Sequence, residues 1–268
     1  MDPRSTLFLP PPALSGCLFG GIFRDTRGAE MSPADRINHF PASPLVSVSL
    51  IGSGELWLLP KHEDDTPLPS IFAYGPTDHP TSSCAFGPVM ALTVGIYHDA
   101  WLQLGGDQMY SNTPKGLTRA LEHFAAFENP EKGWGVFCEI LEPIWKGLRP
   151  TTHKRIQGVG DWTRAVMTRA ALSGPGQSLR SLERRLKRFS GQTRRNLSFY
   201  NSLENLHMIS QQNTGKPIAD IALEAGYSDQ SHMGRAVRRA TGFSPARLNR
   251  AIVTEESFWC YRLLGEKF

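Results

Sequence analysis

The sequence predicts an α+β protein with a β-rich N-terminal domain and an all-helical C-terminal domain. Three observations carry this expectation: short apolar runs broken by Pro and Gly fill the first hundred residues, helical periodicity follows residue 113, and the charge changes sign along the chain. Residues 1–150 hold 10 Lys and Arg against 16 Asp and Glu, whereas residues 151–268 hold 19 against 9. We therefore expect one domain over 1–150 and a second over 151–268, the basic half being suited to a nucleic-acid partner.

Three apolar runs in the N-terminal part have the composition of strands. They cover residues 45–51, 55–59 and 89–97, and they stop at the turn residues Gly52-Ser53-Gly54 and Pro60. Several short strands separated by turn signals predict a sandwich or a small barrel.

Helical spacing begins near Thr113, which is placed to cap a helix opening at Pro114. The pair Asn129-Pro130 is expected to end that helix, and a second one is expected over 135–147. Beyond a polar stretch at 149–160, all segments have helical patterns, and their expected ranges are 161–172, 178–189, 192–211, 217–225, 229–240 and 245–253.

Composition excludes several classes of protein. With 268 residues, 40% hydrophobic and 20% charged, the chain can form a packed core. No run approaches the ~18 consecutive apolar residues of a membrane span. The apolar N-terminal stretch over residues 7–23 is broken by Pro10-Pro11-Pro12, so it does not have the pattern of a signal peptide. The four cysteines form no CxxC pair, which favours free thiols in a reducing cytoplasm.

The stretch 216–245 has the pattern of a helix-turn-helix. Pro217 stands where a helix starts, and Gly226 ends it because glycine readily adopts left-handed backbone. Tyr227 then offers a buried anchor, and Ser228 or Asp229 can cap the next helix. The expected inward positions are Ile218, Ile221, Ala222 and Ala225 on the first helix and Met233, Ala236, Val237 and Ala240 on the second.

The outward face of that second helix has the chemistry to contact DNA. Gln230 can pair bidentately with adenine and Arg235 with guanine, and Ser231 lies in the same first turns. Arg238 and Arg239, one turn later, suit phosphates better. Gly234 lies inside this helix, where it costs ~1 kcal/mol relative to alanine.

A weaker copy of this unit lies 51 residues earlier. Ser178–Gly191 aligns with Asp229–Gly242, placing Leu182 on Met233 and Leu186 on Val237. Gly174-Pro175-Gly176 precedes the copy as Gly226 precedes the other, and Arg194-Arg195 extends its basic surface. Two such units can present two recognition helices to successive major-groove openings, ~34 Å apart.

At these residues the C-terminal ~110 positions resemble the DNA-binding domain of AraC/XylS-type transcriptional regulators. The match is carried by Ile-Ala-x-x-Ala-Gly-Tyr-Ser-Asp-Gln-Ser-His (221–232), an Arg two residues after Met233, and the closing Thr-Gly-Phe-Ser-Pro (241–245). The N-terminal half resembles the β-rich, cupin-like sensor domains that precede this module in many regulators, with residues 24–27, 36–42 and 97–101 fitting one subgroup.

The resemblance implies roles for individual residues. Those expected to face bases are Arg180, Glu183, Arg184, Gln230, Ser231 and Arg235. Those expected at the DNA backbone are Ser178, Lys187, Arg188, Asp229, His232, Arg238 and Arg239. Those expected to build the second unit are Ile221, Ala222, Gly226, Tyr227, Met233, Gly242 and Pro245.

Rival functions have weaker support in the sequence. A cupin-like barrel can hold a catalytic metal, but His39, His62, His79 and His98 form no HxH pair, so we expect no metal and no cofactor. Cys17, Cys84 and Cys138 are more typical of inert buried thiols than of redox sensors. A DNA-targeted repair or modification enzyme, and an interaction adaptor with a degenerate helix-turn-helix, remain the alternatives.

We therefore expect a cytoplasmic, sequence-specific transcription regulator without catalysis. Its expected partners are a double-stranded DNA operator, RNA polymerase, a small-molecule effector of the N-terminal domain and a second copy of the chain, with the helices over 111–150 as the dimerising segment. A membrane partner is not expected.

Overall fold

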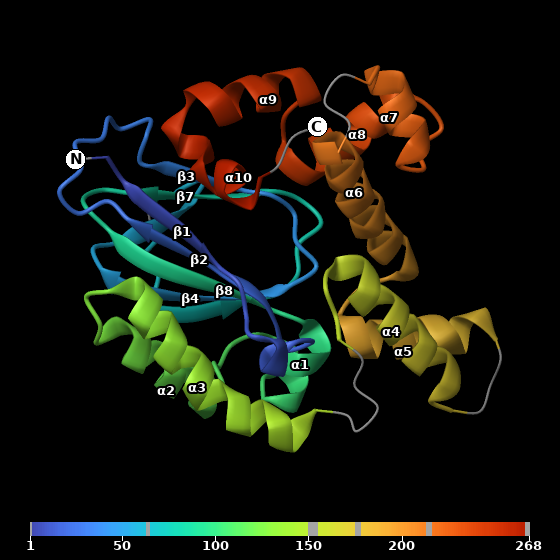
Figure 1. The fold of residues 1–268 in the computed structure, drawn as a ribbon, viewed down its shortest axis with the longest axis horizontal. Helices are drawn as coiled ribbons and strands as arrows, with labels where there is room; N and C mark the ends of the chain where they lie inside the picture. Colours follow the sequence, from blue (N-terminus) through green and yellow to red (C-terminus); the bar gives the residue numbers. More distant parts are fainter. Residues whose placement is uncertain (1, 63–64, 150–154, 175–177, 213–215, 266–268) are drawn as a thin grey trace.

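The computed structural model describes residues 2–62, 65–149, 155–174, 178–212 and 216–265. Strands fill the first part of the chain and helices the rest (Figure 1). The strands are β1 Arg4–Phe8, β2 Leu18–Asp25, β3 Ile37–Phe40, β4 Val46–Ser53, β5 Leu56–Leu59, β6 Ile71–Tyr74, β7 Thr81–Ala85 and β8 Met90–Ile96.

The helices begin at residue 98, apart from a short 3-10 turn, η1 Pro12–Leu14. They are α1 His98–Gln103, α2 Lys115–Ala125, α3 Pro130–Leu148, α4 Val159–Leu172, α5 Leu179–Ser190, α6 Arg194–Gln212, α7 Ile218–Glu224, α8 Gln230–Thr241, α9 Pro245–Thr254 and α10 Trp259–Leu264, with a 3-10 turn η2 Glu256–Phe258 before α10.

The strands form two antiparallel sheets, a larger one ordered β1-β2-β8-β4-β6 and a smaller one ordered β3-β7-β5. Among the described residues these sheets do not close into a barrel, so the sandwich expectation is confirmed over the barrel. The three predicted runs became β4, β5 and β8, and β8 pairs with both β2 and β4 near the centre of the larger sheet.

Alternation along the strands gives the larger sheet two apolar faces. Phe8 and Phe23 point to the face covered by α2 and α3, where both rings contact Phe124 and Phe8 stacks on Trp134. Their neighbours Leu7 and Ile22 point to the opposite face of the sheet, because successive side chains of a strand alternate between its two faces. Figure 1 shows α2 and α3 lying together along one side of this sheet.

One helix boundary differs from the prediction. Asn129-Pro130 does not end α2, which already stops at Ala125; it starts α3 instead. The Asn129 side chain accepts a hydrogen bond from the Lys132 amide, and Pro130 occupies the first turn, where its missing N–H costs nothing. Thr113 makes no side-chain cap, because Pro114 itself precedes the first helical residue of α2.

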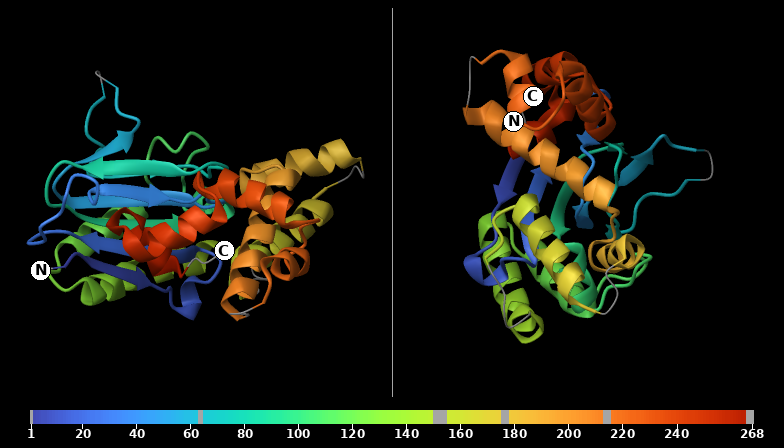
Figure 2. Two further views of the ribbon diagram at one scale, coloured as in Figure 1. Left: turned by 90° about the horizontal axis from the view of Figure 1, so that it is seen from above. Right: turned by 90° about the vertical axis from the view of Figure 1, so that its right-hand side faces the viewer.

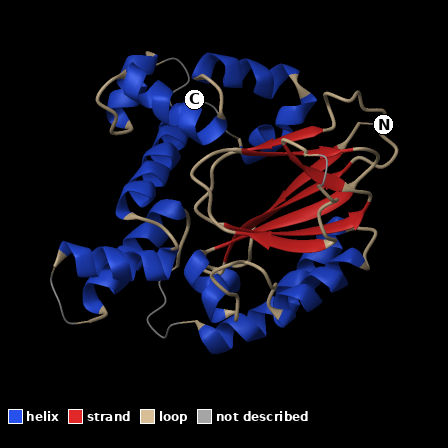
Figure 3. Cartoon of the chain, turned by 180° about the vertical axis from the view of Figure 1, so that it is seen from behind, coloured by secondary structure: helices blue, strands red, loops and turns tan. Residues whose placement is uncertain are grey.

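Helices α4 to α8 lie beside the sheets, and α6 runs between the pair α4–α5 and the pair α7–α8 (Figures 1 to 3). The main hydrophobic core does not stop at the predicted domain boundary. It contains the sheet residues together with Trp162 of α4, Leu186 of α5 and Tyr200 of α6. Residues of α7, α8, α9 and α10 form a second core around Met233, Val237 and Leu248.

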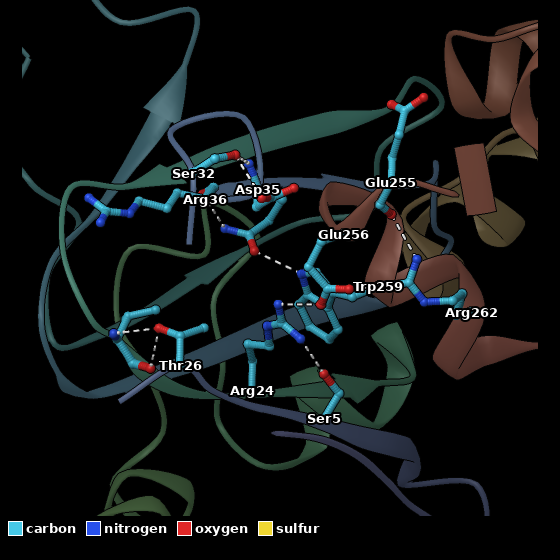
Figure 4. Close-up of polar contacts among 12 residues, drawn as sticks. Ser5, Arg24, Thr26, Ser32, Asp35, Arg36, Glu255, Glu256, Trp259 and Arg262 are labelled. Carbon is cyan, nitrogen blue, oxygen red and sulfur yellow. Dashed lines mark hydrogen bonds and ion pairs between the residues drawn. The ribbon is translucent and has the colours of Figure 1, made fainter. Parts of the chain in front are cut away.

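The C-terminal segment, absent from the sequence expectations, lies against the sheets. Arg24 of β2 is buried and pairs with Glu256 at 2.7 Å, while its guanidinium lies 5.0 Å from the ring centre of Trp259. The Trp259 indole donates to Asn38 Oδ1 at 2.8 Å (Figure 4). These contacts attach the segment from η2 to α10 to β2 and β3.

Candidate DNA interface

The first helix-turn-helix unit consists of α4 and α5. Trp162 and Val166 of α4 are buried against Leu186 of α5 in the main core. The Glu204 carboxylate of α6 accepts from the amides of Val159 and Gly160, at 2.7 and 2.6 Å, and so caps α4. Most of the predicted Gly174-Pro175-Gly176 turn lies outside the described residues.

The second unit consists of α7 and α8, joined by Gly226 with φ +91°. Tyr227, Ala222 and Ala225 are buried, and Met233 and Val237 form the inward face of α8 as predicted. The Asp229 carboxylate accepts from the His232 amide at 2.7 Å, and this hydrogen bond is the main cause that lowers the pKa of Asp229. Asp229 rather than Ser228 is therefore the cap.

Other structural positions of this unit follow the sequence expectation with one exception. Gly242 has φ +83°, and Pro245 stands in the first turn of α9. Ile221 is half-buried against the second core. Ile218, predicted to face inward, is 47% exposed, because the short α7 begins at that residue and only its second turn reaches the core.

The 51-residue repeat extends to individual hydrogen bonds. Ser178 caps α5 through the Ser181 amide, as Asp229 caps α8. At the other end, Ser190 Oγ donates to the Leu186 carbonyl and accepts from the Gln192 amide. Thr241 makes the same two bonds with Val237 and Phe243. The matching caps, the left-handed Gly191 and Gly242, and the buried pairs Leu186/Val237 and Ser190/Thr241 show that α5 and α8 are equivalent elements, although Leu182 is only half-buried where Met233 is buried.

The predicted DNA-contacting residues are almost all exposed. On α5 and its cap these are Ser178, Arg180, Glu183, Arg184, Lys187 and Arg188; on α8 and its cap they are Asp229, Gln230, Ser231, His232, Arg235 and Arg238. His232 packs its ring edge-on against Tyr227, with centres 5.2 Å apart, which agrees with a packed rather than a base-reading side chain. Glu224, the last residue of α7, pairs with Lys216 rather than with Arg235 of α8.

A basic groove lies between α5 and the start of α6. Arg180, Arg184 and Lys187 line one side and Arg194 and Arg195 the other, while Glu183 is the one acidic residue in its wall among those described. The sequence analysis predicted that Arg194-Arg195 extends the basic surface of α5. The groove agrees with this prediction, because the basic face of α5 lies beside the first turn of α6.

Arg239 is the exception among the predicted backbone contacts. Its guanidinium donates to Asp78 Oδ2 at 2.7 Å and to Asn196 Oδ1 at 3.0 Å, and it stacks over Phe199 at 4.1 Å. This ion pair is the first cause that lowers the pKa of Asp78. Asp78 belongs to the β6–β7 loop, so a carboxylate of the sheet domain binds an arginine of α8. No sequence motif marked Asp78.

We also searched the described residues for a metal-binding cluster and for an activated cysteine thiol. In the part of the chain that the structure describes, no group of three His, Cys, Asp or Glu residues is arranged to hold a metal ion. Burial raises the pKa of the Cys138 thiol to about 12 and also raises that of Cys17, so both favour the unreactive thiol form. No described helix is long and apolar enough to cross a membrane.

Comparison with known proteins gives one family match and several distant structures. A family model described as a helix-turn-helix domain matches residues 176–251. ToxT from Vibrio cholerae aligns at 10% identity and a TM-score of 0.37, over 92% of this chain and 97% of that one. ToxT from Vibrio cholerae O395 bound to (E)-4-(8-methylnaphthalen-1-yl)but-3-enoic acid aligns at 11% identity and a TM-score of 0.39, over 92% and 98%.

The AraC-like transcriptional activator CuxR aligns at 13% identity and a TM-score of 0.25, over 89% of this chain and 100% of that one. A search of the curated proteins found no match. The functional assignment therefore rests on the family match to residues 176–251 and on the geometry of the two helical units.

Proposed function

We propose that the chain is a sequence-specific DNA-binding transcription regulator of the AraC type, because a helix-turn-helix family model matches residues 176–251. One observation carries the proposal: α5 and α8 have equivalent N-terminal caps, buried residues at two equivalent positions (Leu186 and Val237, Ser190 and Thr241) and an exposed polar face. A recognition helix needs this combination of a fixed inner face and a free outer face.

Each helix divides its exposed residues between bases and phosphates in this proposal. Arg184 on α5 and Arg235 on α8 occupy equivalent positions and read guanine, with Gln230 and Ser231 reading bases beside them. Arg180 and Glu183 do so on α5. Lys187, Arg188 and Arg238 bind phosphates, and the Arg194-Arg195 side of the basic groove extends that contact.

Regulation completes the proposal. A small molecule that binds the sheet domain differently in two conformations shifts the population able to bind DNA. RNA polymerase is the expected partner at the promoter, and a second copy of the chain is expected to occupy an adjacent site. We also propose a cytoplasmic location, where the protein would meet its DNA. We assign no enzymatic activity to it.

Selection of bound sequences from a random DNA pool tests the proposal with the full-length protein. The expected result is an enriched sequence containing two short motifs whose centres lie ~10–10.5 bp apart, one for each recognition helix. Binding that stays equal on selected and random DNA at every salt concentration would overturn sequence-specific regulation.

A further inference from the structure

The C-terminal segment formed by η2 and α10 has buried side chains on two sides. Phe258 and Tyr261 belong to the second core, together with residues of α7, α8 and α9. Trp259 lies between them in the chain but faces the sheets, where its indole donates to Asn38 Oδ1 of β3 at 2.8 Å. The segment thus joins the second helical unit to the sheet domain, and it lies beyond the family match to residues 176–251.

Arg24 forms the sheet side of this junction and is only 4% exposed. Its guanidinium donates to Ser5 Oγ of β1 at 2.7 Å and to Glu256 Oε1 of η2 at 2.7 Å, and it lies 5.0 Å from the ring centre of Trp259 (Figure 4). Removing one partner of a buried ion pair is costly, because it leaves the other charge uncompensated. The C-terminal segment is therefore firmly attached to β1, β2 and β3.

A second junction lies at the end of α8. The Ala42 amide donates to the Ala240 carbonyl at 2.7 Å, and the Arg239 guanidinium donates to Asp78 Oδ2 at 2.7 Å. The 51-residue repeat provides an internal comparison, because Arg188 of α5 is equivalent to Arg239. Arg188 is exposed, whereas Arg239 is half-buried against the sheet domain. The sheet domain thus occupies only one of two equivalent arginines.

The two junctions differ in strength. The side chains of Asp78 and Arg239 are 44% and 36% exposed, and a partly exposed ion pair contributes little by itself. The C-terminal junction instead contains a buried guanidinium and a buried indole. By keeping the second unit on the sheets, the C-terminal junction keeps Asp78 and Arg239 at a high effective concentration. The weak contact therefore depends on the strong one.

We propose that the segment from η2 to α10 is a latch that keeps the second helical unit docked on the sheet domain, and that docking lowers DNA affinity by holding Arg239 on Asp78. The inference rests on the proposed function, because it concerns regulation of the same DNA interface. In a molecule with the latch released, Arg239 is available to a phosphate. DNA affinity thus depends on the fraction of molecules in the released state.

Trp259→Leu tests the latch in the full-length protein, because leucine keeps an apolar side chain but removes the indole donor and the ring beside Arg24. The variant should bind random-sequence duplex DNA severalfold more tightly. The peptide that contains the Ala42 amide should also exchange hydrogen faster, because the acceptor of that amide belongs to α8. Trp134→Leu is the matched control. It removes a buried indole that donates to the Leu9 carbonyl at 3.1 Å, away from the latch, and should change neither measurement.

Glu256→Gln is a milder variant that keeps the shape of the side chain and removes the charge opposite Arg24. It should change DNA affinity and Ala42 exchange in the same direction as Trp259→Leu, by a smaller factor. Glu131→Gln is its control, because it removes the same charge from an exposed ion pair with Arg4. An unchanged DNA affinity in the folded latch variants, or gains equalled by their controls, would overturn the inference.

A double variant tests whether the latch acts through Arg239. Asp78→Asn releases Arg239 directly, and Trp259→Leu should release it indirectly. The gain in DNA affinity of the double variant should therefore be smaller than the product of the two single gains. Gains that multiply would come from separate sources and would contradict the assigned route.

The DNA selection experiment separates this inference from the proposed function, because the latch is tested on random DNA. A protein that enriches a two-part motif, but whose latch variants bind random DNA as the wild type does, retains the proposed function and loses the latch. A protein whose latch variants gain affinity for random DNA, but which enriches no sequence, retains the latch and loses sequence-specific regulation.

Discussion

Three glycines end helices with backbone that other residues adopt at a cost. Gly191, Gly226 and Gly242 have φ of +68°, +91° and +83°. Their surroundings differ, because a Cβ on Gly226 would meet nothing within 4 Å, whereas one on Gly191 would lie 2.8 Å from the His98 ring. The helix-ending function is therefore shared, but the tolerance for substitution is not.

These surroundings predict a graded series of stabilities. Gly226→Ala should lower the free energy of unfolding by ~1–2 kcal/mol through backbone strain alone. Gly191→Ala should cost more, because the new methyl group also displaces His98. Gly234→Ala is the matched control: it lies inside α8 with open space around it, so helix propensity should raise stability by up to ~1 kcal/mol. Denaturant unfolding measures all three, and equal losses at Gly191 and Gly226 would contradict the His98 contact.

Buried histidines predict the pH dependence of stability. Burial lowers the pKa of His39, His98 and His207, so the unfolded chain binds protons that the folded chain does not as the pH falls below ~6.5. Stability should thus be constant above that pH and decrease below it. His98→Asn keeps a donor for the Phe189 carbonyl without titrating and should reduce the slope between pH 6.5 and 5.

At the residue scale the sequence predicted the caps and turns well and the long-range partners poorly. Gly226, Tyr227 and Asp229 act within a few residues of their own positions, so their chemistry is legible in the local sequence. The Asp78 partner of Arg239 is 161 residues away, and Glu204 caps a helix that begins 45 residues earlier. Such contacts depend on how the elements pack, which no local pattern specifies.

Helices were more predictable than strands at the scale of elements. The six helices predicted beyond residue 160, observed as α4 to α9, have 3.6-residue periodicity and glycine or proline near their ends, and their observed bounds differ from the predicted ones by two residues at most. β3, β6 and β7 have only four or five residues each and lack clear alternation. Their identity as strands follows from pairing with distant segments. The short α10 was missed for a similar reason, since its stability comes from the sheets.

The outer face of α8 predicts how one phosphate contact changes DNA binding. Arg238 is exposed in the last turn of the helix, where its charge is available to the DNA backbone. Arg238→Ala should weaken binding to all sequences alike and flatten the salt dependence by about one unit. Arg119→Ala removes the same charge from an exposed position of α2 and should leave the salt slope unchanged. A loss confined to one base position would contradict the phosphate assignment.

At the scale of the whole molecule, the sheet domain contacts both α8 and the C-terminal segment that begins at η2. The ion pair between Asp78 and Arg239 attaches the end of α8 to the β6–β7 loop, and the pair between the buried Arg24 and the half-buried Glu256 attaches η2 to β2. The first unit shares its hydrophobic core with the same sheets. The two units are thus positioned by the N-terminal part as well as by α6.

The Asp78–Arg239 pair predicts competition between the sheet domain and DNA. A phosphate must displace Asp78 before Arg239 can act as a backbone contact. Asp78→Asn should therefore raise affinity for random DNA severalfold and lower stability only slightly, because a partly exposed ion pair contributes ~0–1 kcal/mol. Glu122→Gln removes the same charge from an exposed position of α2 as the control. Fluorescence anisotropy measures both affinities, and equal changes would show a general charge effect instead.

The central claim is that α5 and α8 are two equivalent recognition helices. It is tested most directly by measuring the affinity of wild type, Arg184→Ala and Arg235→Ala for every single-base variant of a selected DNA site. The account predicts that each alanine variant loses ~1–3 kcal/mol of discrimination in a different half of the site, with the halves one helical turn apart. Losses in the same half, or discrimination unchanged in both variants, would contradict it.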